Sequence, residues 1–239
     1  MILDRRSALI FRLCAFLFAA TGLMRHIGIF RGVFFPGAFM YYTIQSNLLA
    51  VVFFGILVVK SAMGMREGRY GSAGCCPRLS LVVAVDLLVT LFVFWALLVP
   101  QGLDPKYLLS FDNIAVHTVT PLLCLLDYLL FSQPRSLRYR NIYLVCILPG
   151  AYVLFTIIAR FAGYVYRYTG YLGIDNTGSA PVRFPYFFLD FDMLGPLVLA
   201  YMGLILVFFL LLGHILYGYN QRASRPKASE LTAVRQVAG

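Results

Sequence analysis

Two short polar stretches interrupt apolar sequence, and their residue types are those of covalent hydrolytic catalysis. The first is YYTIQSNLL, in which four polar side chains fall within five positions: Thr43, Gln45, Ser46 and Asn47. The second is NIAVHTVTPLL, in which Asn113 and His117 are one helical turn apart. A threonine hydroxyl becomes an effective nucleophile when a neutral histidine removes its proton. The two stretches therefore predict Thr43 as a nucleophile and His117 as a general base that later protonates the leaving group.

The chemistry that such a pair supports is acyl transfer to water, in which an ester is cleaved through an acyl-threonine intermediate. The reaction also needs hydrogen-bond donors for an oxyanion, and polar side chains on neighbouring turns are candidates for this role or for substrate binding: Gln45, Ser46, Asn47 and Asn113. A third group commonly orients the histidine, and Asp190 or Asp192 is a candidate for it. The sequence leaves the choice among these candidates open.

The elements that must hold these residues are membrane spans. The chain has 239 residues, of which 61% are hydrophobic and only 13% are charged, and its mean hydropathy is +0.81. A soluble domain carries about 25% charged residues, so a soluble globular protein is excluded. Apolar stretches long enough to cross about 30 Å of hydrocarbon predict an all-α integral membrane protein with six transmembrane helices: 8–29, 39–60, 79–99, 112–131, 141–160 and 191–217.

The basic residues are distributed unequally between the two ends of these spans. The net charge is +10, but the positive residues lie between and beyond the spans, which favours a role in membrane orientation over nucleic-acid binding. Thirteen of them lie on the side of both termini: Arg5, Arg6, Lys60, Arg66, Arg69, Arg78, Arg135, Arg138, Arg140, Arg222, Arg225, Lys227 and Arg235. Six lie on the opposite side: Arg25, Arg31, Lys106, Arg160, Arg167 and Arg183. This predicts cytoplasmic termini, with residues 218–239 as a basic, disordered cytoplasmic tail.

The depth of the two polar stretches brings them into one layer. Both spans begin at the outer face, and a rise of 1.5 Å per residue places Thr43 about 6 Å and His117 about 7 Å below the start of its helix. A site in this layer meets molecules that partition into lipid. The predicted partners are therefore membrane lipids and an amphiphilic acyl ester whose chain stays between helices while its ester reaches water.

The connection between the fifth and sixth spans is the longest, and it is rich in aromatic residues. It contains Tyr164, Tyr166, Tyr168, Tyr171 and Tyr186, and it ends in the string RFPYFFLDFD. One interpretation is an aromatic belt at the outer interface. The other is a lid or lateral gate over the site.

One further polar residue lies deep within an apolar stretch. Asp86 falls about 10 Å into the third span, counted from the cytoplasmic side. Because a buried carboxylate needs compensation, we expect it to be protonated or paired with a residue such as Arg12 in the first span.

At these same residues the sequence resembles a known family. The strings YYTIQSNLL, NIAVHTVTPLL and RFPYFFLDFDMLG are similar to parts of the androgen-induced-gene-1 and androgen-dependent TFPI-regulating proteins and their bacterial multi-span relatives. The resemblance implies a six-helix protein of a bacterial plasma membrane and a threonine hydrolase that cleaves fatty acid esters of hydroxy fatty acids. It also implies the catalytic pair, because the threonine that opens the second span matches Thr43 and the histidine of the fourth span matches His117.

Other functions compete with this interpretation. The main alternative is a non-catalytic lipid or small-molecule carrier that uses the polar cluster as its binding site. Haem binding is a weaker one, since His26 and His117 lie near one layer. Three histidines on three spans, without clustered carboxylates, do not predict a metal site, and no cofactor is expected.

Overall fold

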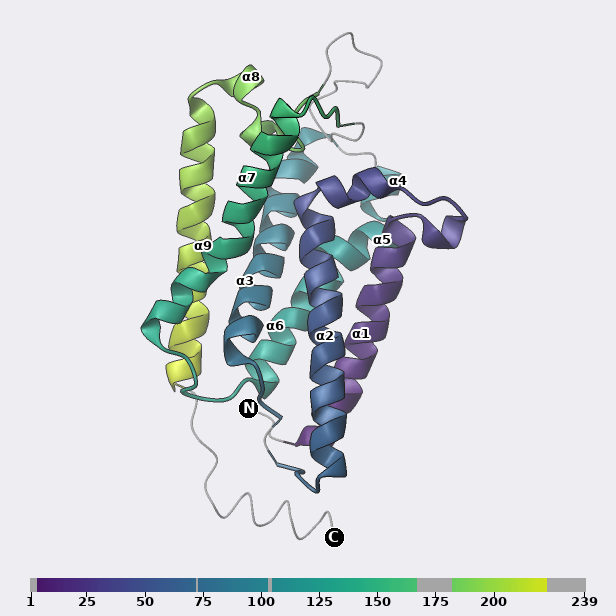
Figure 1. The fold of residues 1–239 in the computed structure, drawn as a ribbon, viewed down its shortest axis with the longest axis vertical. Coiled ribbons are helices and arrows are strands. Elements are labelled where there is room, and N and C mark those ends of the chain that lie inside the picture. Colours follow the sequence, from purple (N-terminus) through teal and green to yellow (C-terminus); the bar gives the residue numbers. More distant parts are fainter. Residues whose placement is uncertain (1–3, 72, 103–104, 167–181, 223–239) are drawn as a thin grey trace.

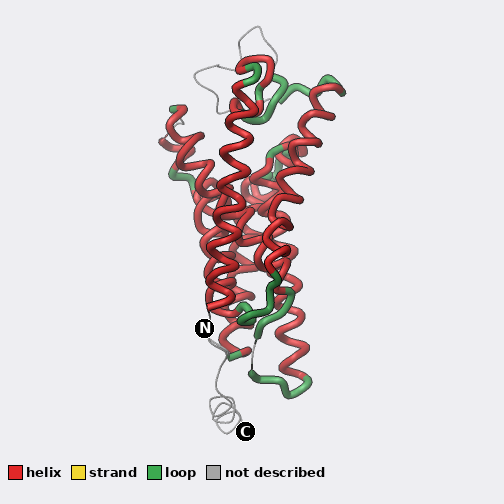
Figure 2. Tube along the Cα trace, turned by 90° about the vertical axis from the view of Figure 1, so that its left-hand side faces the viewer, coloured by secondary structure: helices red, strands yellow, loops and turns green. Residues whose placement is uncertain are grey.

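The structure is a computed structural model that describes residues 4–71, 73–102, 105–166 and 182–222. Over these residues the chain is helical and contains no strand (Figure 2). Six segments are long and apolar enough to cross a membrane: Arg5–His26, Tyr42–Arg66, Pro77–Gln101, Phe111–Phe131, Tyr139–Phe161 and Leu197–Arg222. The predicted all-α fold with six spans is therefore confirmed, and it fits an integral membrane protein.

Three spans are single α-helices and three are composite. The single helices are α1 (Arg5–His26), α2 (Tyr42–Arg66) and α9 (Leu197–Arg222). The parts of the composite spans are, in chain order, α3 (Pro77–Val93), the π-helical η3 (Phe94–Leu98), η4 (Val99–Gln101), α5 (Phe111–Ile114), the π-helical η5 (Ala115–Val119), α6 (Thr120–Phe131), η6 (Tyr139–Cys146) and α7 (Ile147–Phe161). Short helical turns make up the rest: η1 (Ile29–Arg31), η2 (Pro36–Met40), α4 (Pro105–Leu108), η7 (Phe187–Leu189) and α8 (Phe191–Leu194).

Capping and backbone breaks move the span boundaries by a few residues from the predicted ones. The first helix begins at Arg5, because the Asp4 carboxylate accepts hydrogen bonds from two backbone N–H groups of the first turn. The last span begins at Leu197 rather than at 191, because Gly195 has a positive φ of 53° and Pro196 follows it. It continues to Arg222 instead of ending at 217. Residues 223–239, most of the predicted tail, lie outside the described part of the chain.

The helices run along the long axis of the molecule in three groups (Figure 1). α1 and α2 lie on one side, α7 and α9 on the other, and α3 and α6 between them. α1 begins and α9 ends at the same end of the bundle, the lower end of Figure 1. We call the opposite end, where α2 begins and η7 and α8 lie, the distal end. α7 runs obliquely to α9 rather than parallel to it.

Small residues allow α1 to pack closely on its neighbours. Ala15 of α1 and Ala50 of α2 belong to one buried cluster. At Gly22 an added Cβ would lie 2.6 Å from the Ala115 Cβ at the start of η5. Small residues at helix contacts in membranes permit this backbone approach. Glycine at position 22 therefore lets α1 pack directly on the segment that carries His117.

A buried ion pair near the lower end corrects one expectation. Arg12 pairs with Asp127, not with Asp86, at 2.7 Å from Nε to Oδ1. Its Nη1 also donates to the Ser61 hydroxyl at 2.9 Å and to the Ala73 carbonyl at 3.0 Å. Asp86 instead accepts a hydrogen bond from the Tyr42 hydroxyl at 3.2 Å. The reason is helix packing, because α1 packs on α2 and α6 rather than on α3, which carries Asp86.

Candidate functional site

Thr43 and His117 are in direct contact at the distal half of the bundle. The Thr43 Oγ1 lies 3.3 Å from His117 Nε2. The other ring nitrogen, Nδ1, lies 3.1 Å from the Asn113 backbone carbonyl oxygen. A carbonyl only accepts hydrogen bonds, so a neutral His117 carries its proton on Nδ1 and presents the Nε2 lone pair to the threonine hydroxyl. This is the arrangement that a general base requires.

The backbone around His117 is π-helical for a reason that the sequence contains. Pro121 has no N–H, and the Thr120 N–H bonds to the Ala115 carbonyl five residues back. The Val116 carbonyl is thereby left without a donor from its own helix. Asn47 supplies one, because its Nδ2 donates to the Val116 carbonyl at 2.9 Å. Single π-helical turns of this kind occur often at functional sites.

Asn47 joins the helix of Thr43 to the segment that carries His117. Its Nδ2 also donates to the Thr43 carbonyl at 2.8 Å, so both of its N–H groups are used. The Ser46 hydroxyl lies 3.1 Å from the Thr43 carbonyl and 3.1 Å from the Thr90 hydroxyl of α3. These two oxyanion candidates are thus next to Thr43, but their donors already bond to protein acceptors. Both residues position the pair.

The other two oxyanion candidates face away from the pair. The Gln45 Nε2 donates to the Phe39 carbonyl of η2 at 2.9 Å. The Asn113 Nδ2 donates to the Leu108 carbonyl at the end of α4 at 3.0 Å. Asn113 contributes through its backbone instead, as the acceptor for His117. The sequence therefore identified the correct neighbourhood for these residues but not their roles.

Neither candidate carboxylate orients the histidine. Asp190 accepts from the Met193 N–H at 3.0 Å and caps α8, and burial raises the pKa of its carboxyl group. Asp192 forms an ion pair with Arg160, at 3.0 Å from Oδ2 to Nε. The Asn113 carbonyl takes the place that was expected for a carboxylate. The expectation failed because Nδ1 of a helical histidine reaches the carbonyl one turn back.

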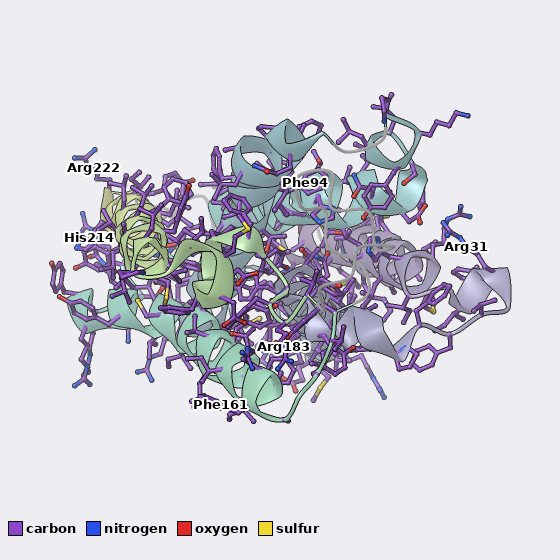
Figure 3. All side chains as sticks on the ribbon, turned by 90° about the horizontal axis from the view of Figure 1, so that it is seen from above. Arg31, Phe94, Phe161, Arg183, His214 and Arg222 are labelled. Carbon is purple, nitrogen blue, oxygen red and sulfur yellow. The ribbon has the colours of Figure 1, made fainter. Side chains whose placement is uncertain are left out.

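Aromatic rings fix the plane of the imidazole. Phe94 of η3 stacks on His117 with ring centroids 3.8 Å apart and an interplanar angle of 18°. The edge of the His26 ring lies on another side, at 6.2 Å between centroids. Seen from above, Phe94 lies among the helices, whereas Phe161 and His214 lie at the rim (Figure 3). Thr43 and His117 are 8% and 6% exposed, so the pair is shielded from bulk water.

The segment that stacks on His117 is itself π-helical. η3 carries Phe94 and Trp95, and the Trp95 Nε1 donates to the Thr118 hydroxyl of η5 at 3.0 Å. Two π-helical segments on adjacent spans therefore contact each other at the site, one holding the histidine and the other covering it. Each π-helical segment is followed by a proline in the sequence: Pro121 follows η5, and Pro100 follows η3.

Tyr186 is a site residue that the sequence did not single out. It comes from the aromatic string RFPYFFLDFD and lines the same cavity as Thr43. Burial raises the pKa of this phenol, so it is a neutral O–H donor at physiological pH. Tyr186 is the one tyrosine in that string, and this could have marked it as a polar site residue. Its position beside the second span could not be predicted, because sequence periodicity does not tell which helix a connecting segment contacts.

The described part of the aromatic segment is packed into the protein. Phe187, Phe188 and Leu189 are buried together with Tyr152 of α7 and Tyr186. Phe188 and Leu189 line the same cavity as Thr43, and the choice between a lid and an interfacial belt stays a prediction. Tyr164 stacks edge-on with Tyr166, and Tyr166 with Tyr41. Tyr168 and Tyr171 lie outside the described residues.

A cavity of about 350 Å³ adjoins the pair. Thr43, Tyr186 and Tyr152 line it at one side, and apolar residues of α3, α7 and α9 form most of the remainder. Among the residues that the structure describes, no charged side chain lines it. Pockets of this size that are mainly apolar with a few polar groups are typical ligand sites. Of Thr43 and His117, only Thr43 lines the cavity, and Phe94, which stacks on His117, lines it as well.

The chain has no significant match among protein-family models, curated proteins or solved structures. Its function must therefore be argued from this site.

Proposed function

We propose that the protein is an intramembrane hydrolase of lipid esters that uses Thr43 as nucleophile and His117 as general base. The observation that carries the proposal is the contact between Thr43 Oγ1 and His117 Nε2, with the Nδ1 proton held by the Asn113 carbonyl. The sequence resemblance to the androgen-induced-gene-1 and androgen-dependent TFPI-regulating proteins supports the same pair. Fatty acid esters of hydroxy fatty acids, or similar acyl esters, are the substrate class that follows.

The reaction proceeds in two acyl transfers. His117 Nε2 takes the Thr43 proton as Oγ1 attacks the ester carbonyl carbon, which gives a tetrahedral oxyanion. The oxyanion collapses, the C–O bond to the alcohol breaks, and the imidazolium returns its proton to the departing alkoxide. Water then attacks the acyl-threonine with His117 again as base, and the fatty acid leaves as Oγ1 regains the proton. The Tyr186 O–H is the neutral donor near Thr43 that can stabilise the oxyanion.

The proposal also assigns a membrane and an orientation. Six apolar spans require a bilayer, and we place the protein in a bacterial plasma membrane with both termini in the cytoplasm. The excess of basic residues on the side of the termini supports this. The distal end, with Thr43, then faces the outer leaflet.

The direct test is ester hydrolysis by the purified protein in detergent. Substrates are fluorogenic acyl esters and hydroxy-fatty-acid esters, and the variants are Thr43→Ala and His117→Ala. We expect each to lose about 10³-fold or more in kcat/KM while remaining folded, because each removes one half of the pair. Thr156→Ala is the matched control, since Thr156 is a buried threonine of α7 that bonds within its own helix.

A second readout identifies the nucleophile itself. A fluorophosphonate probe that reacts with activated hydroxyls should label wild-type protein at Thr43, as mapped by peptide mass spectrometry, and should not label Thr43→Ala. If no ester is turned over and no label forms in folded protein, the pair is structural. Retained lipid in that case would favour the carrier function, for which the large uncharged cavity is the specific observation.

A further inference from the structure

The cavity beside Thr43 reaches the surface of the molecule between α7 and α9. Gly150 of α7 and Gly203 of α9 both line it, and both are exposed. A Cβ added at either glycine would meet no atom within 4 Å. The cavity wall therefore has an opening here, formed by two residues without side chains on two helices that run obliquely to each other (Figure 1).

The surface around this opening is apolar. Leu154 and Ile158 of α7 are each 59% exposed, and Leu199, Leu206 and Val207 of α9 are exposed as well. Large exposed aliphatic residues on two membrane-spanning helices face the hydrocarbon of the bilayer, because no soluble protein surface has this composition. The opening thus connects the cavity with lipid and not with water.

Side chains of the described residues line the other sides of the cavity. Phe188 and Leu189 lie at the distal end, where they are each 6% exposed. Val89 and Val93 of α3 and Phe209 of α9 form further parts of its wall. The open glycines therefore mark a sideways route to Thr43, and the part of a molecule that lies inside the cavity must be uncharged and apolar.

We propose that the cavity is an acyl-chain site and that Gly150 and Gly203 form a lateral portal through which the chain enters from the bilayer. The Thr43 hydroxyl stands at the inner wall, so a chain that fills the cavity brings its carboxyl end to the catalytic pair. The identity of the bound group as an ester rests on the proposed function. The portal itself is inferred from the exposed glycines Gly150 and Gly203 and from the apolar residues that line the cavity.

The test is photolabelling of the full-length protein in phosphatidylcholine vesicles with a fatty acid that carries a diazirine in its chain. Adducts are mapped by mass spectrometry in wild type, Gly150→Leu, Gly203→Leu and the matched control Gly218→Leu. Gly218 is also on α9 and also has no atom near an added Cβ, but it does not line the cavity. Wild-type adducts should fall in 146–153 and 202–209. They should drop about fivefold or more in the two portal variants and stay unchanged in the control.

Thr43→Ala keeps the portal, so its labelling should equal that of wild type. Labelling and turnover test the two proposals separately. Labelling at these segments without any ester turnover supports the acyl-chain site and contradicts the hydrolase function. Where turnover is present, the portal variants should raise KM for long-chain esters about tenfold and leave acetyl esters unaffected. Equal labelling in all four proteins, or adducts confined to other helices, would overturn the portal.

Discussion

Thr43 differs from Thr90 and Thr156, two other buried threonines of the spans, in the partner of its hydroxyl. The Thr90 hydroxyl donates to the Asp86 carbonyl at 3.0 Å, and that of Thr156 to the Val153 carbonyl at 2.8 Å. Both satisfy a membrane-buried O–H within one helix, which is what such residues usually do. The carbonyls of Phe39 and Met40, one turn before Thr43, belong to η2 and accept from Gln45 and Tyr152, so the Thr43 hydroxyl faces an imidazole from another span instead. Because Thr43 lies in the first turn of α2, its hydroxyl is available for a hydrogen bond to His117.

Tyr186 gives a residue-scale prediction that separates binding from chemistry. Tyr186→Phe keeps the ring in its buried cluster and removes only the hydroxyl beside Thr43. We expect kcat to fall about 10²-fold with little change in KM, because an oxyanion donor acts mainly in the transition state. Steady-state kinetics on one long-chain ester measures both constants.

The matched control is Tyr219→Phe, whose hydroxyl donates to the Leu129 carbonyl at 2.7 Å near the lower end of the bundle. Its kcat should stay at the wild-type value. A Tyr186→Phe enzyme with unchanged kcat would show that the phenol only packs against the site.

At the scale of elements, Pro121 determines the helical geometry that aims His117. Pro121→Ala restores an N–H and removes the reason for the π-helical turn, so residues 115–119 can relax to α-helix. That change rotates His117 relative to Thr43 and withdraws the Val116 carbonyl from Asn47. We expect thermal stability to stay equal or rise, while kcat/KM falls about 10²-fold or more.

Pro77→Ala serves as the control, because a proline in the first turn of a helix interrupts no hydrogen bond. Thermal unfolding in detergent and kcat/KM should both remain near wild type for it. Full activity in folded Pro121→Ala would mean that the π-helical turn is not needed for the pair.

Element lengths and depths could be predicted from the sequence, while contacts that depend on helix rotation could not. Apolar runs located all six spans, and counting residues from their ends placed Thr43 and His117 in one layer. Arg12 was one candidate partner for Asp86 and pairs with Asp127 instead, because depth alone does not tell which neighbours a helix has. Asp190 was a candidate for orienting the histidine, and its capping role could not be predicted because the short helix α8 that it caps was expected to be part of the sixth span.

At the scale of the whole molecule, the Arg12–Asp127 pair connects four parts of the chain at the lower end. Arg12 of α1 bonds Asp127 of α6, Ser61 of α2 and the loop carbonyl of Ala73. Arg12→Met or Asp127→Leu leaves one buried charge without its partner, and each should destabilise the fold by about 3–5 kcal/mol.

The double variant Arg12→Met/Asp127→Leu removes both charges, so it should recover most of that loss. Thermal unfolding of the four proteins in one detergent gives the coupling between the two sites. Additive effects of the single changes would contradict a direct pair.

The excess of basic residues at the lower end predicts the orientation of the protein, and the orientation determines which leaflet supplies the substrate. If the basic loops at the lower end are cytoplasmic, a green fluorescent protein fused after Gly239 should fluoresce, and alkaline phosphatase fused there should be inactive. Phosphatase fused after Lys106, on the distal side, should be active. Thr43 and the portal then lie in the outer half of the bilayer, and esters added to the outer leaflet of cells should be cleaved first. The opposite pattern of fusions would reverse the orientation and place the site on the cytoplasmic side, where newly made lipid esters would reach it.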